Sequence, residues 1–278
     1  MEKLSAVVPT YNEQAKIGDC LRSLRWADEL LVVDSNSTDG TVDAARELAD
    51  RVEVHPFEGF AAQKNWCLDR ASHRWVLLVD ADEVCSPELR DEITRVLARP
   101  SDAGYWIPRV NYFLGKRMRG CGWGRQKVLR LFDRERGRYP DRLVHETLAL
   151  DGSAGYLNAP LFHRPYESLD DYWVKFHRYA RLSAEEMRAQ GRKCGIGSVL
   201  SRPPARFIRM YFLQLGFVDG AHGLVLCGLA ALQVYAKYAT LWELNRENED
   251  SAHRHRDHLE GRRSTGSGPG QGAHGQRP

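Results

Sequence analysis

The stretch Leu4–Glu13, LSAVVPTYNE, is a short apolar run that ends in a proline and polar residues. The same pattern returns in LLVVD at Leu30–Asp34 and in WVLLVD at Trp75–Asp80. Residues 12–26 and 61–71, which lie between these runs, carry apolar side chains at helical spacing. Buried strands that alternate with helices are typical of parallel βαβ units. The sequence therefore predicts an α/β, Rossmann-like fold with a mostly parallel sheet and flanking helices.

Later segments continue this alternation. Ser86 and Pro87 suit the start of a helix that runs to about Leu97, because serine caps helices and proline fits the first turn. Strands are predicted at 105–113 and 128–132, and a loop rich in Gly, Arg and Lys at 114–127. Residues 170–190 predict a long helix rich in aromatic side chains.

The composition excludes several classes of protein. With 42% apolar residues, a chain of 278 residues can bury a core, so it is not wholly disordered. Six scattered cysteines without a CxxC pair argue against a zinc module or a disulfide framework. The net charge of +3 hides opposed blocks: residues 1–108 carry 12 basic and 20 acidic side chains, and residues 109–142 carry 11 and 3. This division suggests metal or sugar chemistry beside an anion or membrane contact.

Three parts of the chain are expected. Residues 1–165 form the catalytic domain, 166–246 a helical extension, and 247–278 a disordered tail rich in Gly, Ser, His and Arg. The N-terminal sequence does not resemble a signal peptide, so a cytoplasmic location is expected. The apolar centre at 224–232 is too short to span a bilayer, and a transmembrane anchor is not expected.

Polar residues follow each of the three apolar runs: YNE at 11–13, DSNS at 34–37 and DADE at 80–83. Ligands of open α/β sheets bind beyond the carboxyl ends of the strands. Two carboxylates one residue apart, Asp80 and Asp82, suit a divalent cation that also keeps substrate phosphates as ligands. A loop of solvated acids is the alternative.

Taken together, VVPTYNE at Val7–Glu13, VVDSNSTDGT at Val32–Thr41 and DADE resemble family 2 glycosyltransferases of the GT-A fold over roughly residues 1–165. Further segments resemble the branch that contains the lipopolysaccharide core heptose β-1,4-glucosyltransferases. These are GFAAQKN at Gly59–Asn65, RLF at Arg130–Phe132, VHE at Val144–Glu146, GFVDG at Gly216–Gly220 and KYATLWE at Lys237–Glu243.

The resemblance implies roles for individual residues. Those near the nucleotide-sugar are Pro9, Tyr11, Glu13, Asp34, Lys64 and Asp80. Asp34 would read the uracil or the ribose, and Asp82 would be the main ligand of Mg²⁺ or Mn²⁺. For Lys64, an ordinary surface lysine is the alternative.

Inverting transfer needs a carboxylate that deprotonates the acceptor hydroxyl. Glu146 is the predicted base, because it lies in LVHE where the acceptor-side carboxylate of the family is expected. The family more often has Asp in this role. Glu83 is the rival, although its place beside the metal ligand suits a structural role better.

The basic block from Arg109 to Arg142 has two interpretations. Its cations are either solvated or bind the donor diphosphate and an anionic acceptor, with Arg125 and Arg130 as the preferred pair and Trp123 as a surface that stacks on an acceptor sugar. No nucleic-acid motif is present, so nucleic acid is not an expected partner. His163 is either a loop histidine or an additional metal ligand, as in some GT-A enzymes.

Residues 203–244 combine an aromatic and aliphatic segment with Arg202, Arg206 and Arg209, a composition that suits the interface of an anionic membrane. A helical subdomain packed on the catalytic core or on a second subunit is the alternative.

The sequence thus predicts a metal-dependent inverting glycosyltransferase on the inner face of the cytoplasmic membrane. It would move a hexose, glucose by resemblance, from a UDP-sugar to a lipid-linked core oligosaccharide. The alternatives are the same chemistry on a polyprenyl-phosphate or peptide acceptor, and a non-catalytic protein that binds sugar nucleotides.

Overall fold

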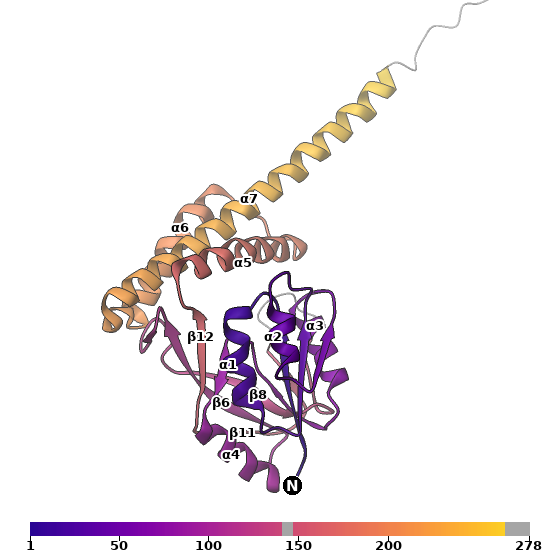
Figure 1. Ribbon diagram of the computed structural model, residues 1–278. Coiled ribbons are helices and arrows are strands. Elements are labelled where there is room, and N and C mark those ends of the chain that lie inside the picture. Colours follow the sequence, from indigo (N-terminus) through magenta and orange to yellow (C-terminus); the bar gives the residue numbers. More distant parts are fainter. Residues whose placement is uncertain (141–146, 265–278) are drawn as a thin grey trace, which may run out of the picture.

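The structure, a computed structural model, describes residues 1–140 and 147–264, and the side chains of residues 1–140 and 147–246. It contains the predicted alternation of strands and helices (Figure 1). The elements of the first half are β1 Leu4–Thr10, α1 Gln14–Leu24, β2 Glu29–Asp34, α2 Thr41–Arg46, β3 Arg51–Val54, α3 Phe60–Arg70, β4 Trp75–Leu78, β5 Glu83–Cys85 and α4 Pro87–Ala98. The second half comprises β6 Gly104–Phe113, β7 Lys116–Arg117, β8 Gln126–Asp133, β9 Gly137–Arg138, β10 Ala149–Leu150, β11 Ala154–Tyr156, β12 Leu161–Tyr166, α5 Leu169–Ala189, α6 Ile196–Ile208 and α7 Gly220–Ser264.

The main sheet has the order β3-β2-β1-β4-β8-β6-β12-β5. Its first four strands are parallel, as the βαβ pattern predicts, whereas β8 and β5 pair antiparallel with their neighbours. This mixed sheet with helices on its faces is the GT-A fold, and the predicted fold class is confirmed. The antiparallel pair β5 and β12 is important below because it carries residues of the site.

Two apolar clusters cover the two faces of the sheet. Alternate residues of β1 point to opposite sides: Ala6 and Val8 pack with Ile17 of α1, and Val7 packs with Leu68 of α3. Because helices cover both faces, the strands read as continuous apolar runs rather than as alternating patterns. All six cysteines are free and buried, in agreement with their scattered spacing.

The helices α5, α6 and α7 form a layer on one end of the sheet (Figure 1). Buried side chains such as Leu226, Cys227 and Met210 join this layer to Phe113 and Met118 of the catalytic domain. The helix α7 continues to Ser264, so the boundary expected at residue 247 lies inside a helix. The division of the chain into three parts stays a prediction.

The length argument against a membrane-spanning helix does not hold. Among the described residues, the helix over Gly216–Arg246 is long and apolar enough to cross a membrane by length and composition, with a mean hydropathy of 1.5 in its most apolar window. The Gly, Ala, Tyr and Gln residues beside the short apolar centre do not interrupt this window. The expectation that no segment spans the membrane stays a prediction.

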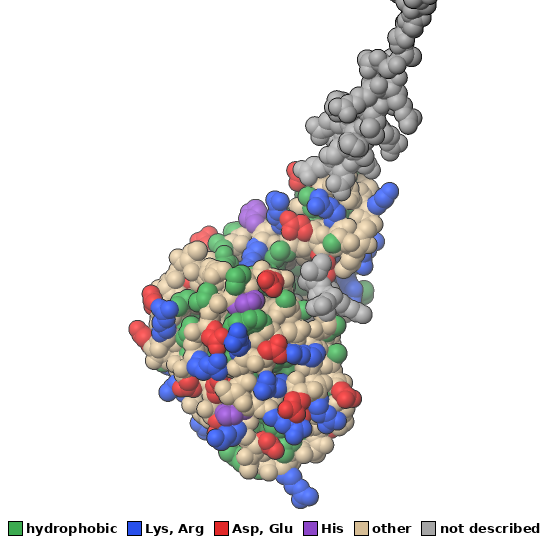
Figure 2. Space-filling view, turned by 90° about the vertical axis from the view of Figure 1, so that its right-hand side faces the viewer, with side chains coloured by type: hydrophobic (Ala, Val, Ile, Leu, Met, Phe, Trp, Pro, Cys, Tyr) green, Lys and Arg blue, Asp and Glu red, His purple; other side chains and the backbone are tan. Residues whose placement is uncertain are grey.

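Charged side chains on the face shown in Figure 2 are of both signs and lie side by side over the catalytic domain. Among the described residues, three cations of segment 109–142 form ion pairs with acids of the first 108 residues: Arg109 with Glu83, Arg130 with Asp80 and Glu83, and Arg138 with Asp69. Folding thus brings part of the basic block against the acidic block.

Candidate active site

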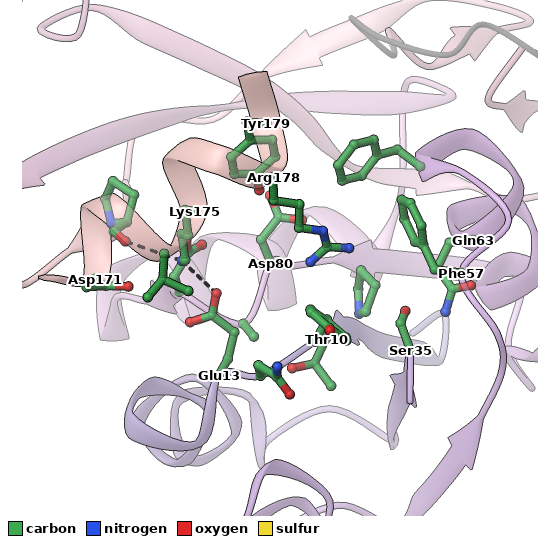
Figure 3. A pocket seen from close by; sticks show the side chains of 18 of the residues that line it. Thr10, Glu13, Ser35, Phe57, Gln63, Asp80, Asp171, Lys175, Arg178 and Tyr179 are labelled. Carbon is green, nitrogen blue, oxygen red and sulfur yellow. Dashed lines mark hydrogen bonds and ion pairs between the residues drawn. The ribbon is translucent and has the colours of Figure 1, made fainter. Parts of the chain in front are cut away.

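A cavity of about 400 Å³ lies at the carboxyl ends of β1, β2 and β4. Parallel strands place the polar residues that follow them at one edge of the sheet, which is why segments far apart in the sequence meet here. Helix α5 forms the opposite wall, and Figure 3 shows its Lys175, Arg178 and Tyr179 directed into the cavity. Of the predicted residues, those that line the cavity are Pro9, Tyr11, Glu13, Lys64, Asp80, Asp82 and His163.

Asp80 lies in the tight turn after β4, and its charge is neutralised by Arg130. Arg130, which is 6% exposed, bonds its carboxylate and also lies 3.2 Å from Glu83. Although burial opposes ionisation, the charge of Arg130 holds the pKa of Asp80 well below its usual range. Asp80 is thus a fixed anion at the cavity wall.

Glu83 is fully buried below this turn. It pairs with Arg109 and Arg130 at 3.2 Å, and its Oε2 accepts from the backbone N–H of Asp80 at 3.1 Å. A carboxylate so enclosed has no access to an acceptor hydroxyl. Its role is to hold the turn that presents Asp80 and Asp82.

Asp82 faces His163, with 3.5 Å between Oδ1 and Nε2. The Nδ1 of His163 lies 2.7 Å from Oδ1 of Asn111, and the Asn111 amide donates to the Trp123 carbonyl at 2.7 Å. The amide orientation is thereby fixed, so His163 carries its proton on Nδ1 and directs the Nε2 lone pair at Asp82. Burial lowers the pKa of His163, which favours this neutral form.

A lone pair and a carboxylate oxygen that face each other are the donors of a cation site. The described residues hold no group of three or more side chains that could bind a metal. Two protein ligands nevertheless fit Mg²⁺ or Mn²⁺ when the substrate phosphates supply further oxygens. Asp82 and His163 are therefore a suitable pair for a metal that binds together with a diphosphate.

Lys175 connects α5 to the carboxylates. Its Nζ lies 2.6 Å from Glu13 Oε1 and 3.6 Å from Asp82 Oδ2. Burial opposes its charge, but Asp82 and Glu13 raise the pKa of Lys175 well above its usual value. Burial raises the pKa of Glu13, with Lys175 acting against that shift and Asp82 adding to it. Lys175 thus already places a cation beside these two acids, and Lys16 Nζ lies 3.8 Å from Oε2 of Glu13.

The other end of the cavity is aromatic. The guanidinium of Arg178 lies 4.2 Å from the ring centroid of Tyr11 and 5.2 Å from that of Phe57. Phe60 stacks on Tyr179 with centroids 6.2 Å apart. Such planar surfaces beside a cation suit a nucleotide base next to its diphosphate.

The structure does not bring four of the predicted residues to the cavity. Asp34 is buried, and its carboxylate accepts from the N–H and hydroxyl of Ser37, so it shapes the loop instead of contacting a base. Arg130 lies behind Asp80 and is a positioning residue. Arg125 is exposed outside the cavity, and Trp123 packs edge-on against Phe113. These four residues thus lie outside the cavity wall, and their assignments as ligands stay predictions. The predicted base Glu146 lies outside the described residues.

Sequence reasoning missed Lys175, Arg178 and Tyr179. The sequence predicts that residues 170–190 form a helix rich in aromatic side chains. The available signal was that Lys175 and Arg178 lie three residues apart, which places them on one side of a helix next to the aromatic ones. Nothing in the sequence indicated that this side faces the ends of distant strands.

The chain is similar to several known proteins. Residues 5–147 match the sequence model of the family described as "Glycosyl transferase family 2". The chain is 30% identical to the lipopolysaccharide core biosynthesis glycosyltransferase LpsC of Rhizobium meliloti, over 85% of this chain and 93% of LpsC. It is 28% identical to an uncharacterized glycosyltransferase of Rickettsia typhi, over 88% of each chain. Similar solved structures include S. aureus TarS in complex with UDP-GlcNAc, at 16% identity, a TM-score of 0.45 and coverage of 88% of this chain and 92% of that one. Another is the Pyrobaculum calidifontis mannosyltransferase PcManGT, at 21% identity, a TM-score of 0.45 and coverage of 90% and 80%.

Proposed function

The chain belongs to glycosyl transferase family 2 and is a glycosyltransferase, and from this premise we propose that it acts in the synthesis of lipopolysaccharide core. The proposed donor is a UDP-hexose, with UDP-glucose as the first candidate. The proposed acceptor is a lipid-linked core oligosaccharide at the inner face of the cytoplasmic membrane. The similarity to LpsC along nearly its whole length supports the biological role. The observation that carries the chemistry is the cavity in which Asp82, His163 and Lys175 meet.

Asp82 and His163 would hold Mg²⁺ or Mn²⁺. When bound, such an ion neutralises charge on the leaving diphosphate. Arg178 with Tyr11 and Phe57 would hold the nucleotide base, and Lys175 would meet the diphosphate as a second cation. The paired Asp80 is fixed where it can accept from a ribose hydroxyl.

The proposed reaction is a single displacement with inversion. The acceptor oxygen forms a bond to the anomeric carbon as the bond from that carbon to the diphosphate oxygen breaks. The acceptor proton passes to a carboxylate, Glu146 in this proposal, and UDP leaves.

A thermal-shift screen of UDP- and GDP-sugars with Mn²⁺ tests the donor. Since a ligand that binds only the folded state stabilises it by about 2.7 kcal/mol at 100 times its Kd, UDP-glucose is expected to raise Tm by several degrees. The shift should need both Mn²⁺ and the sugar nucleotide. A clearly larger shift with a GDP-sugar would contradict the UDP assignment.

Replacing Lys175 with methionine is expected to move two affinities in opposite directions. Mn²⁺ alone should bind more tightly, because Glu13 and Asp82 lose the ammonium that neutralises them. UDP should bind about tenfold more weakly, because its diphosphate loses a charged partner. Electron paramagnetic resonance measures free Mn²⁺, and calorimetry measures UDP.

The matched control is Lys175→Arg, which keeps the charge and should leave both affinities near those of the wild type. If Lys175 only stabilises the fold, the Lys175→Met variant will lose affinity for both Mn²⁺ and UDP. That outcome would remove Lys175 from the donor site.

A further inference from the structure

The connection between α6 and α7 is an exposed apolar surface. We call Ile208–Val225 the apolar tip; it includes a π-helical turn at Arg209–Leu213 and a 3₁₀ turn at Gly216–Asp219. Eight of its large apolar side chains are 41% to 76% exposed: Ile208, Phe212, Leu213, Leu215, Phe217, Val218, Leu224 and Val225. A continuous group of this kind is unusual on a protein surface and marks a contact with a partner or a membrane.

The tip is held rigidly on the catalytic domain. Asp219 is 1% exposed, and its carboxylate accepts from the N–H groups of Arg119 and Gly120 at 2.7–3.1 Å. Lys116 Nζ donates to the Asp219 carbonyl at 2.6 Å. Glycine is required at 120, because a Cβ there would lie 2.0 Å from the Leu215 carbonyl oxygen.

The backbone of the tip is also strained. Leu215 has φ of 57°, a left-handed conformation that bulky residues rarely adopt. Strain of this kind persists where the surrounding contacts over-determine it, as the Asp219 bonds do here. The fold therefore holds these apolar side chains exposed to solvent, although burial of apolar side chains is ordinarily favoured.

Cations border the tip. Residues 187–218 contain six basic and no acidic side chains. Arg202, Arg206 and Arg209 are exposed and follow one another at intervals of one helical turn. The pKa of Lys237 on α7 is lowered by burial and then by the charges of Arg206, Arg192 and Arg202, so cations gather on this side of the helical layer. This border matches an anionic surface.

Helix α7 is bound along the catalytic side. Tyr172 of α5 donates to the Leu229 carbonyl at 3.0 Å, and Leu226, Cys227, Leu241 and Leu244 are buried between the helices. Although α7 is long and apolar enough to cross a bilayer, crossing would break these contacts. The geometry favours a helix that lies at the interface with only the tip immersed.

We propose that the apolar tip inserts into the outer part of an anionic phospholipid leaflet, with Arg202, Arg206 and Arg209 on the lipid phosphates. The donor cavity then stands at a fixed position above the membrane, because α5 contacts α7 through Tyr172 and lines the cavity with Lys175. In Figure 1 the tip is the left-hand end of the helical layer, away from the free end of α7. One part of this proposal rests on the proposed function, namely that such a position would suit a lipid-linked acceptor.

The test is sedimentation of the full chain with vesicles of phosphatidylethanolamine and 30% phosphatidylglycerol, and with vesicles of phosphatidylcholine. The triple variant Phe212→Ser, Leu213→Ser, Phe217→Ser is expected to bind the anionic vesicles at least about tenfold more weakly than the wild type. The triple variant Arg202→Gln, Arg206→Gln, Arg209→Gln should lose the preference for anionic vesicles and the sensitivity to salt. The matched control is Val54→Ser with Tyr156→Ser, which removes exposed apolar residues elsewhere and should bind like the wild type.

The Tm and UDP binding of each variant are measured in parallel. Equal sedimentation of the wild type and the folded triple variant would overturn the proposal. So would a change from dimer to monomer in the triple variant without a change in vesicle binding, because the tip would then bind a second copy of the chain. Loss of vesicle binding with UDP binding retained supports the tip, whereas absence of UDP binding in the wild type would overturn only the proposed donor.

Discussion

Replacing Asp82 with alanine is expected to abolish metal-stimulated turnover, a loss of roughly 10³-fold. The reason is geometric: Asp82 Oδ1 faces the Nε2 lone pair of His163 at 3.5 Å, and removing the carboxylate leaves a single neutral ligand. The measurement is hydrolysis of UDP-glucose with Mn²⁺, together with Mn²⁺ binding by electron paramagnetic resonance. Both should fall, because the same residue serves binding and turnover.

Asp91→Ala is the matched control, since Asp91 is an exposed acid of α4 paired only with its neighbour Arg90. It should keep wild-type activity. Donor hydrolysis that depends on Mn²⁺ in the wild type separates an enzyme from a protein that only binds sugar nucleotides. Persistence of that dependence in Asp82→Ala would show that the metal lies elsewhere.

Glu146→Gln is expected to lower transfer by 10²–10⁴-fold while UDP still binds, as removal of a general base does. Asn65 holds the backbone of Tyr139 through two hydrogen bonds of 2.8 and 3.0 Å, and Lys64 beside it lines the cavity. The chain up to Tyr139 is thus held beside a wall of the cavity.

Single-turnover transfer and UDP calorimetry measure the two effects separately. Glu135→Gln, an exposed acid in the turn before this segment, should behave like the wild type. Transfer near the wild-type rate in Glu146→Gln would exclude this residue as the base. Another base would then have to be sought on the acceptor side of the cavity.

The sequence was sufficient for the elements whose pattern is local. Strands such as LLVVD are buried on both faces and therefore strongly apolar, and the Asp80 turn follows directly from one of them. The cavity edge was predictable for the same reason, because parallel strands bring their ends together.

The role of a charged residue was not predictable where it depends on which partner that residue binds. Arg130 and Asp34 have the residue types of ligands, but Arg130 bonds the far side of Asp80 and Asp34 caps its own loop. Trp123 appeared suitable for stacking on a sugar, yet its ring packs on Phe113. Helix α5 was predicted correctly as a helix, but its contribution to the cavity depends on a contact between distant parts of the chain.

This contribution of α5 has a consequence for dissecting the enzyme. A fragment that ends at residue 165 would retain every motif by which the family is identified, because the family match ends at residue 147. It would nevertheless lack Lys175, Arg178 and Tyr179, and the carboxylates Glu13 and Asp82 would lose their contact with the Lys175 ammonium. Chimeras designed to change donor preference should therefore exchange α5 together with the strand ends, since the cavity is shared between the segment that the family model matches and a helix beyond it.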